Sequence, residues 1–375
     1  MTADSALFGL LADLPRLGPK RLRVVLAHHD PGEALGLLAS GSSLHLMPMR
    51  AIGSDLDRVR AAARAIGPVP AAAAELVQRC ERSGVRILAL VDAAYPAVLR
   101  SDAASPPVLY ARGHDAAMAG RRVGIVGTRN ATATGLATAR ELGEELAAGG
   151  VTVVSGLARG IDAAAHEGTR RSDGCAVAVV GCGPDVPYPR RNTELWEWVA
   201  TDGLLLSEYG PGTQPDSWRF PQRNRILAAL SEVLVVVESR ERGGSLITVR
   251  EALDRGVQVM AVPGSPRSRA SRGTNQLLVD GAAPIASVDD VFAMLGIDHR
   301  RHDADIIDPR PPPVGDEVAV LDVCGGGPCT LDTIVAESGL SVAAAALAAA
   351  RLERSGWLLE AGGWFEVAGS RLGSR

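Results

Sequence analysis

The chain has 375 residues, of which 46% are hydrophobic and 22% are charged, and its formal net charge is −4 at pH 7. This composition excludes a chain that is disordered over most of its length, and the length suits two or three domains of about 150 residues each. No apolar run reaches the ~18 residues of a membrane helix, and the N-terminus lacks the pattern of a signal peptide, so we expect a cytoplasmic protein.

The first 90 residues are rich in alanine and carry mainly helical patterns. Within them, LPRLGPKR at residues 14–21 is typical of a helix-hairpin-helix turn, in which a glycine-centred loop offers backbone amides to a phosphate. We prefer a packing role in a small helical domain to a DNA contact at this turn. We therefore predict a helical domain of helix-hairpin-helix type over residues 1–90.

Between residues 91 and 296, short apolar runs alternate with helical patterns. Residues 134–148, for example, place Leu136, Leu142 and Leu146 on one helical face and end at a glycine pair. This alternation is typical of a mostly parallel sheet with helices on its faces, so we predict an α/β core of Rossmann-like type. The predicted strands are Arg122–Gly127, Val151–Ser155, Ala176–Gly181, Leu204–Ser207, Val233–Glu238, Val257–Val262 and Pro284–Ala286.

The C-terminal part has a different composition. Residues 297–313 are charged and rich in proline, which predicts a linker. From 314 to 375, helical patterns at 331–338 and 341–352 and a hairpin pattern at 357–360 and 364–367 predict a winged-helix-like domain. Residues 296–375 hold 7 basic and 12 acidic side chains. An acidic domain repels the phosphate backbone, so we expect it to contact proteins rather than DNA.

Arginine supplies all but one of the 39 basic residues, the exception being Lys20. A phosphate contact therefore falls to arginine, whose planar fork suits bidentate binding, although genomic composition is the alternative reason for this bias. The chain also has five cysteines without C-x-x-C spacing, which predicts packing roles and no metal site. They are Cys80, Cys175, Cys182, Cys324 and Cys329.

Two small-residue turns follow the first two predicted core strands. GIVGTRNATATG at 124–135 and VVSGLARGIDAAAHEG at 153–168 each end a strand and start a helix, and they carry Arg129 and Arg159. Such turns let a phosphate approach backbone amides at a helix N-terminus. The first lacks G-x-G-x-x-G spacing, which argues against an NAD-type cofactor. Asp162 and His166 have the spacing of a catalytic pair, but a capping carboxylate and a packed histidine satisfy it too, and we prefer that structural interpretation.

Three further turns follow the later strands. GCGPDVPYPRRN at 181–192 carries Arg190 on a proline-stiffened loop. SEYGPGTQPDSWRFPQRNRILAALSE at 207–232 interleaves aromatic residues with arginines, as single-stranded nucleic-acid sites do, with a buried aromatic pair beside surface arginines as the alternative. ERGGSLITVREALDRG at 241–256 is an amide-rich nest without the ending of a Walker A loop, which argues against ATP hydrolysis.

All five turns follow a strand and precede a helix, so they converge on the carboxyl edge of the sheet. The length of this edge and its aromatic residues favour an oligonucleotide over a mononucleotide. We predict a groove for single-stranded nucleic acid with no catalytic residue, metal or cofactor. The predicted contacts are Gly127, Thr128, Arg129, Ser155, Gly156, Arg159, Arg190, Ser217, Arg219, Phe220, Arg223, Asn224, Arg225, Gly244 and Ser245.

These ordered motifs resemble the DNA-processing protein A (DprA, also called Smf) family over about residues 95–295. The matching segments are YPAVL, PPVLYARG, GIVGTR, SGLARGIDAAAH, GCGPDVPYPRRN, SEYGPGTQPDSWRFPQRNRILAAL, GGSLITVREA and VPGSPRSRASRGTNQLLVDGA. The resemblance implies a Rossmann-like core with a sterile-alpha-motif-like helical domain before it and a winged helix after it. It also implies a non-enzymatic protein of natural transformation that protects incoming single-stranded DNA, loads the RecA recombinase and forms a homodimer through its core.

Carried onto matching positions, the resemblance implies Arg129 and Arg190 as phosphate contacts and Phe220 as an aromatic contact. Ser217 stands where many members have a lysine, and Arg219 is the candidate replacement for that charge. The alternative function is a nucleotide hydrolase similar to the phosphoribohydrolases, whose GG-x-x-x-T-x-x-E pattern is echoed at residues 243–251. The chain lacks their PGGxGT loop, and release of free base from nucleoside monophosphates would distinguish this alternative.

Overall fold

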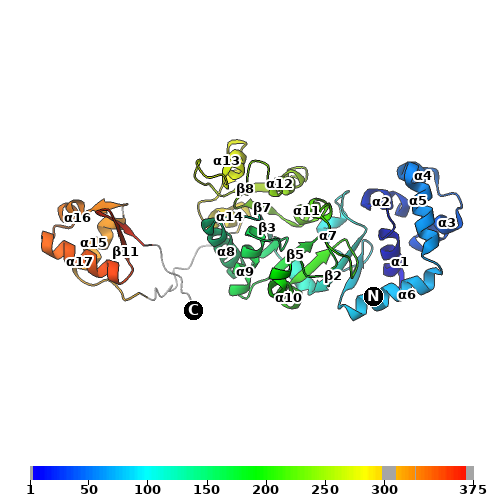
Figure 1. Ribbon diagram of the computed structural model, residues 1–375, viewed down its shortest axis with the longest axis horizontal. Coiled ribbons are helices and arrows are strands. Elements are labelled where there is room, and N and C mark those ends of the chain that lie inside the picture. Colours follow the sequence, from blue (N-terminus) through cyan, green and yellow to red (C-terminus); the bar gives the residue numbers. More distant parts are fainter. Residues whose placement is uncertain (1–2, 298–309, 326, 369–375) are drawn as a thin grey trace. The chain divides into compact units, whose positions relative to one another are not determined.

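The computed structural model describes residues 3–297, 310–325 and 327–368, and it contains two compact units, within residues 1–299 and 300–375 (Figure 1). The larger unit is built on one nine-stranded sheet. Its strands are β1 Arg86–Ala89, β2 Val108–Gly113, β3 Arg122–Val126, β4 Thr152–Ser155, β5 Ala176–Val180, β6 Leu204–Ser207, β7 Val233–Val236, β8 Gln258–Ala261 and β9 Ala283–Pro284.

The sheet confirms the predicted fold class. Its strand order is β1-β2-β6-β5-β4-β3-β7-β8-β9, and the neighbouring strands from β6 to β9 in this order all pair in parallel. Each of the seven predicted strands is present, with small shifts at the ends. Almost every residue of these strands is buried, because helices cover both faces of a parallel sheet and leave no solvent side.

Two strands extend the sheet beyond the prediction. β2 pairs antiparallel with β6, and β1 pairs antiparallel with β2, from Arg86 opposite Ala111 to Ala89 opposite Val108. The predicted boundary at residue 90 assigns β1 to the helical domain, whereas the structure places it in the sheet of the core. Only the four-residue helix α7 Ala97–Arg100 lies between β1 and β2, so the alternation of apolar runs and long helical patterns that marks the parallel strands is missing here.

Helices cover the two faces of the sheet through different hydrophobic clusters. On one face, α7 Ala97–Arg100, α11 Arg219–Leu230 and α12 Ser245–Leu253 pack on the even-numbered residues of β3 and β7. On the other face, α8 Ala133–Ala148, α9 Ile161–Arg171, α10 Thr193–Asp202 and α14 Val288–Met294 cover the remaining side chains. α13 Arg272–Val279 follows β8 and contacts it (Figure 1).

The N-terminal helices form a further packed layer. They share one hydrophobic cluster with β1 and β2, including Leu35, Ile87 and Tyr110, so this helical part packs directly on the antiparallel end of the sheet. Gly18 takes a positive φ of 39° where the chain turns into the second helix, at the place of the predicted hairpin loop. The helices are α1 Ala3–Ala12, α2 Pro19–Leu26, α3 Pro31–Ser40, α4 Leu46–Ile52, α5 Leu56–Ala65 and α6 Val69–Arg82.

The smaller unit contains helices and a three-stranded antiparallel sheet. Its elements are α15 Asp316–Gly325, β10 Cys329–Thr330, α16 Leu331–Ser338, α17 Val342–Arg354, β11 Leu358–Ala361 and β12 Trp364–Val367. They enclose a small core with Ile334, Leu352 and Leu358 buried in it. The predicted helices and hairpin are therefore present, and the winged-helix assignment stays a prediction. Most of the predicted linker, residues 298–309, lies outside the described residues.

The described residues contain neither a single membrane-spanning helix nor a cluster of metal ligands. No single described helix is long and apolar enough to cross a bilayer; α16 and α17 together satisfy length and composition but are bent by 114°. No group of three or more histidine, cysteine, aspartate or glutamate side chains in the described ranges is arranged to hold a metal ion.

Candidate functional site

A cavity of about 540 Å³ opens at the carboxyl ends of the parallel strands. The chain runs from β3 through β4 and β5 to β6 on one side of the sheet, and from β7 through β8 to β9 on the other. The strand order therefore reverses between β3 and β7, and ligands of open α/β sheets bind at this reversal. Residues after β3, β4, β5, β6 and β7 all contribute to the cavity wall.

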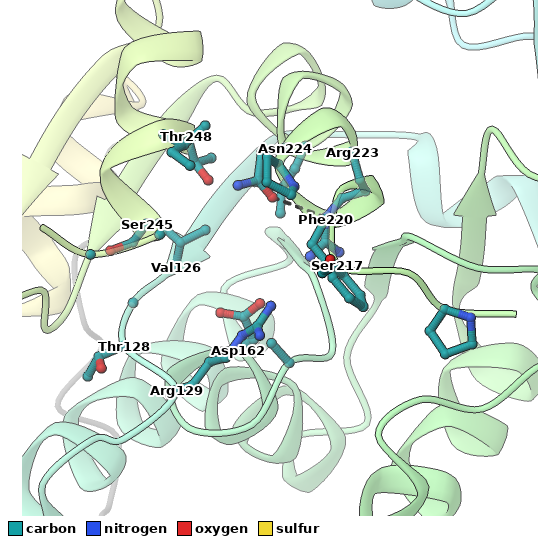
Figure 2. Close-up of a pocket in the computed structure, with 18 of the residues that line it drawn as sticks. Val126, Thr128, Arg129, Asp162, Ser217, Phe220, Arg223, Asn224, Ser245 and Thr248 are labelled. Carbon is teal, nitrogen blue, oxygen red and sulfur yellow. Dashed lines mark hydrogen bonds between the residues drawn. The ribbon is translucent and has the colours of Figure 1, made fainter. Parts of the chain in front are cut away.

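An aromatic and cationic wall faces this cavity. The rings of Tyr188 and Phe220 stack with their centroids 5.5 Å apart and their planes inclined by 25°. The guanidinium carbon of Arg129 lies 5.2 Å from the centroid of Phe220. Figure 2 labels Arg129 and Phe220 beside the cavity. Arg129 follows β3, whereas Phe220 lies in the first turn of α11. The wall thus offers an aromatic face for a base next to a cation for a phosphate.

The β7 side of the cavity is made of small polar residues. Gly243, Gly244 and Ser245 precede and start α12, whose first turn has no acidic residue. Gly244 is exposed, and a Cβ built on it would meet no atom within 4 Å, so the backbone there is open to a ligand. Figure 2 shows Ser245 and Thr248 across the cavity from Phe220. The positive end of α12 therefore faces the same space as Arg129.

The N-terminus of α8, by contrast, is closed by the chain itself. Glu238, 7% exposed, accepts hydrogen bonds from the backbone N of Thr132 at 2.9 Å and from its Oγ1 at 2.5 Å. A Cβ on Gly135 would lie 2.4 Å from the carboxyl carbon of Glu238. The sequence predicted that these helix amides would receive a ligand phosphate. This is wrong, because the Glu238 carboxylate already occupies their position and would repel a second anion.

Buried polar groups form the floor of the cavity. The guanidinium group of Arg223 donates to the carbonyl oxygens of Gly156, at 3.1 Å, and of Val179. Burial lowers the pKa of Arg223 and raises the pKa of Asp162, while the charges of the two groups oppose these shifts. A Cβ on Gly156 would lie 2.5 Å from the Arg223 guanidinium nitrogens, so only glycine fits there. Arg223 therefore ties together the ends of β4 and β5.

His166 lies in the same buried region and gives a prediction about pH. Its ring is 0% exposed, and neither nitrogen has a hydrogen-bond partner among the described residues. Burial, with a smaller contribution from Arg223, lowers its pKa from 6.5 to about 3. At a pH below the histidine pKa of the unfolded chain, about 6.5, unfolding takes up a proton that the folded protein does not bind. The free energy of unfolding should therefore decrease by about 2 kcal/mol as the pH falls from ~6.5 to ~5.

Urea unfolding at several pH values would test this prediction. His166→Leu removes the titrating group at similar volume, so its unfolding free energy should depend less on pH over this window. His114→Leu, at an exposed histidine, is the matched control and should keep the dependence of the unchanged protein. Equal pH dependence in all three proteins would contradict the assignment.

The residues next to Phe220 divide between the cavity and its rim. Ser217 lines the cavity, and Arg219 does not. The Arg219 guanidinium carbon lies 4.8 Å from the ring centroid of Tyr209 and 5.1 Å from that of Trp218, and the group donates to the carbonyl of Gln214. Aromatic contacts thus hold Arg219 at the rim, and its replacement of the missing lysine charge stays a prediction.

Six predicted contact residues lie outside the cavity lining. Ser155 is buried and donates to the carbonyl of Ile125 at 2.6 Å. Arg225 pairs with Glu208 at 2.7 Å and donates to the carbonyl of Ala104. Their polar groups are therefore occupied within the chain. The other residues outside the lining are Gly156, Arg159, Arg190 and Arg219, and contacts of all six with DNA stay predictions.

The cavity brings the remaining predicted residues together and adds others. Gly127, Thr128, Arg129, Ser217, Phe220, Arg223, Asn224, Gly244 and Ser245 all line it. Tyr188, Arg240, Ile247 and Thr248 line it too and were not among the predicted contacts. Arg240 had a usable signal, because it lies in the short turn between β7 and the glycine pair Gly243–Gly244. Asp162 also lines the cavity, but as part of its buried floor.

The glutamate that echoes the phosphoribohydrolase pattern has a different environment. The Glu251 carboxylate lies 2.6 Å from Nη1 of Arg255, whose Nε lies 2.9 Å from Asp102. Glu251 does not line the cavity. Its carboxylate, on α12, is therefore held in a chain of ion pairs with Arg255 and Asp102, which does not favour a role in hydrolysis.

Comparison with known proteins gives a consistent result. The family DNA recombination-mediator protein A matches residues 86–296, more than half of the chain. The DNA processing protein DprA of Bacillus subtilis is 40% identical over 213 residues, which cover 56% of this chain and 72% of that protein.

Solved structures agree with the sequence comparison. The structure of DprA from Streptococcus pneumoniae has a TM-score of 0.66 and 30% identity, covering 78% of this chain and 98% of that one. DprA from Helicobacter pylori, described for its unique single-stranded DNA binding mode, has a TM-score of 0.50 and 30% identity over 56% of this chain and 95% of that one. The family match to residues 86–296 and these relatives show that the chain belongs to the DNA recombination-mediator protein A family, DprA/Smf.

Proposed function

We propose that this chain binds single-stranded DNA in the cavity between the β3 and β7 turns and acts in DNA processing during natural transformation. Arg129 contacts a phosphate, Phe220 and Tyr188 stack on bases, and the backbone at Gly244 and Ser245 receives a further phosphate. Arg159 and Arg190, both exposed on neighbouring turns, extend these contacts along the edge. The single-stranded DNA binding described for the Helicobacter pylori relative supports this proposal.

The convergence of Arg129, Phe220 and Gly244 on one cavity carries the proposal. They come from three different strand-to-helix connections, and Arg129 remains exposed although it lies over the half-buried Phe220 ring. A duplex hides its base faces in the stack, so stacking on Phe220 selects an unpaired strand. Gel-shift titration with single- and double-stranded oligonucleotides of equal length tests this, and equal affinity for the two would contradict it.

Replacing Arg129 by alanine should weaken binding of all single-stranded sequences by about fivefold and reduce the salt slope by about one phosphate contact. The guanidinium group supplies charge and no base recognition, so the loss should not depend on sequence. Binding isotherms over a range of salt concentrations measure this effect. Arg121→Ala, at the opposite edge of the sheet before β3, is the matched control and should leave the slope unchanged.

We propose further that the protein is a recombination mediator and not an enzyme. Two observations support this view: Asp162 and His166 are buried, and the Glu251 carboxylate is paired with Arg255. Incubation with nucleoside monophosphates, followed by chromatography for free base, tests it. Release of base by this chain, and not by an Arg129→Ala variant, would favour the hydrolase alternative.

We also propose that the chain loads RecA and forms a homodimer through its Rossmann-like core. The proposed division is into residues 1–90, 91–296, 297–313 and 314–375, with β1 at the end of the first segment belonging to the core sheet. Light scattering measures the oligomeric state. RecA loading would appear as faster RecA assembly on DNA already coated with single-strand-binding protein. The acidic smaller unit is proposed to contact proteins, and its deletion should leave DNA affinity largely intact.

A further inference from the structure

A second group of arginines lies beyond the cavity on the same edge of the sheet. The loops after β7, residues 239–244, and after β8, residues 262–272, hold five arginines and one acidic residue, Glu241. All five arginines are exposed, and none of their guanidinium groups has a hydrogen-bond or ion-pair partner among the described residues. We term them the β7–β8 arginine cluster: Arg240, Arg242, Arg267, Arg269 and Arg272.

This lack of partners sets the cluster apart from other arginines nearby. Arg225 is paired with Glu208, and Arg255 is paired with both Asp102 and Glu251. Those ion pairs connect helices to loops within the fold. The guanidinium groups of the cluster form no hydrogen bond or ion pair with the described residues. Contacts within the fold therefore do not explain why arginine stands at these positions.

Backbone contacts hold the two loops of the cluster against each other. The backbone N of Gly273 donates to the carbonyl of Ser239 at 2.7 Å, and a Cβ on Gly273 would lie 2.6 Å from the carbonyl oxygen of Arg240. The side chain of Asn275 bonds both the N and the O of Gly264, at 3.1 and 2.9 Å, which closes the β8 loop. The backbones that carry the cluster are therefore joined to each other.

The cluster lies next to the cavity, on the side of β7 that faces away from β3. Adjacent strands lie about 4.8 Å apart, and β8 lies next to β7 on the side away from β3. Arg240 lines the cavity, whereas Arg267, Arg269 and Arg272 follow β8 (Figure 1 labels β7, β8 and α13). Positive charge therefore extends along the edge from Arg129 through Arg240 to the β8 loop.

Helix orientation adds to this positive potential. α11, α12 and α13 all begin at the carboxyl edge, and none has an acidic residue in its first turn. α13 begins at Arg272, where a cation opposes the helix dipole. A fold that places unpaired cations at a positive helix end, in a chain of net charge −4, is arranged for an anionic partner.

We propose that the β7–β8 arginine cluster is an additional phosphate-contact surface, along which a DNA strand held in the cavity continues past β8. This inference rests on the proposed binding of single-stranded DNA. Neither loop contains an aromatic residue, so this surface grips the sugar-phosphate backbone and does not stack on bases. Its contribution is independent of sequence and decreases with salt.

The test compares two DNA lengths in the full chain. Fluorescence anisotropy with oligothymidylates of about 6 and about 20 nucleotides separates contacts in the cavity from contacts beyond it. The variant Arg267→Ala/Arg269→Ala/Arg272→Ala should bind the longer strand about tenfold more weakly, with a salt slope smaller by about 2. Its affinity for the shorter strand should equal that of the unchanged protein.

A matched control removes the same charge elsewhere. Arg50, Arg58 and Arg79 are exposed on α4, α5 and α6, and their replacement by alanine should leave binding of both lengths unchanged. The inference is overturned if the cluster variant binds the longer strand normally, if it loses both lengths equally, or if the control variant loses as much. If the unchanged protein binds neither strand, the proposed function itself fails, which is a separate result.

Discussion

Replacing Phe220 by alanine is expected to weaken binding of single-stranded DNA by about 10- to 100-fold. A stacked base contributes about 1–3 kcal/mol, and Phe220 is the ring on which both Tyr188 and Arg129 rest. Removing it therefore takes away one stacking surface and releases a second aromatic ring and a cation from their positions. Fluorescence anisotropy with a labelled oligothymidylate measures the change in Kd.

Two control variants make the Phe220 result specific. Trp364→Ala removes an aromatic ring, 53% exposed, from β12 of the smaller unit and should leave Kd unchanged. Phe220→Trp keeps an aromatic face and should retain most of the affinity. A loss of less than threefold for Phe220→Ala, or an equal loss for Trp364→Ala, would contradict stacking in the cavity.

Replacing Gly168 by alanine is expected to lower the free energy of unfolding by about 3 kcal/mol or more. A Cβ at this position would lie 1.9 Å from the carbonyl oxygen of Arg140 and 2.9 Å from the backbone N of Glu144. Both obstacles are backbone atoms of α8, so no side chain can rotate to make room. α9 would have to move away from α8, and α9 carries Asp162 and directly follows the turn after β4.

Urea unfolding followed by tryptophan fluorescence measures the effect of this substitution. Gly36→Ala is the matched control, because a Cβ there would meet nothing within 4 Å and α3 continues through the position. Alanine in that helix interior should be neutral or stabilising by up to about 1 kcal/mol. Similar unfolding midpoints for the Gly168 and Gly36 variants would show that α8 and α9 are not held as closely as the structure indicates.

Local patterns were enough to predict the parallel core. The runs Arg122–Gly127 and Val233–Glu238 are short, apolar and bounded by small or polar residues, and both became strands. Because parallel strands end at one edge, the order of strands and helices also predicted that Arg129, Phe220 and Gly244 meet. The two antiparallel strands β1 and β2 carried no such alternation and needed the packing of the N-terminal helices to identify them.

By itself, the sequence determined the fold class and the edge of the sheet where ligands approach, since both follow from periodicity along the chain. Only the tertiary structure decided which charged groups remain available there. Arg223 and Arg225 are neighbours of equal charge on α11, yet one is buried under the cavity and the other is paired with Glu208. Glu238, which follows β7 and is 106 residues from Thr132 along the chain, occupies the N-terminus of α8. Burial and pairing depend on contacts between distant segments, and no local pattern encodes them.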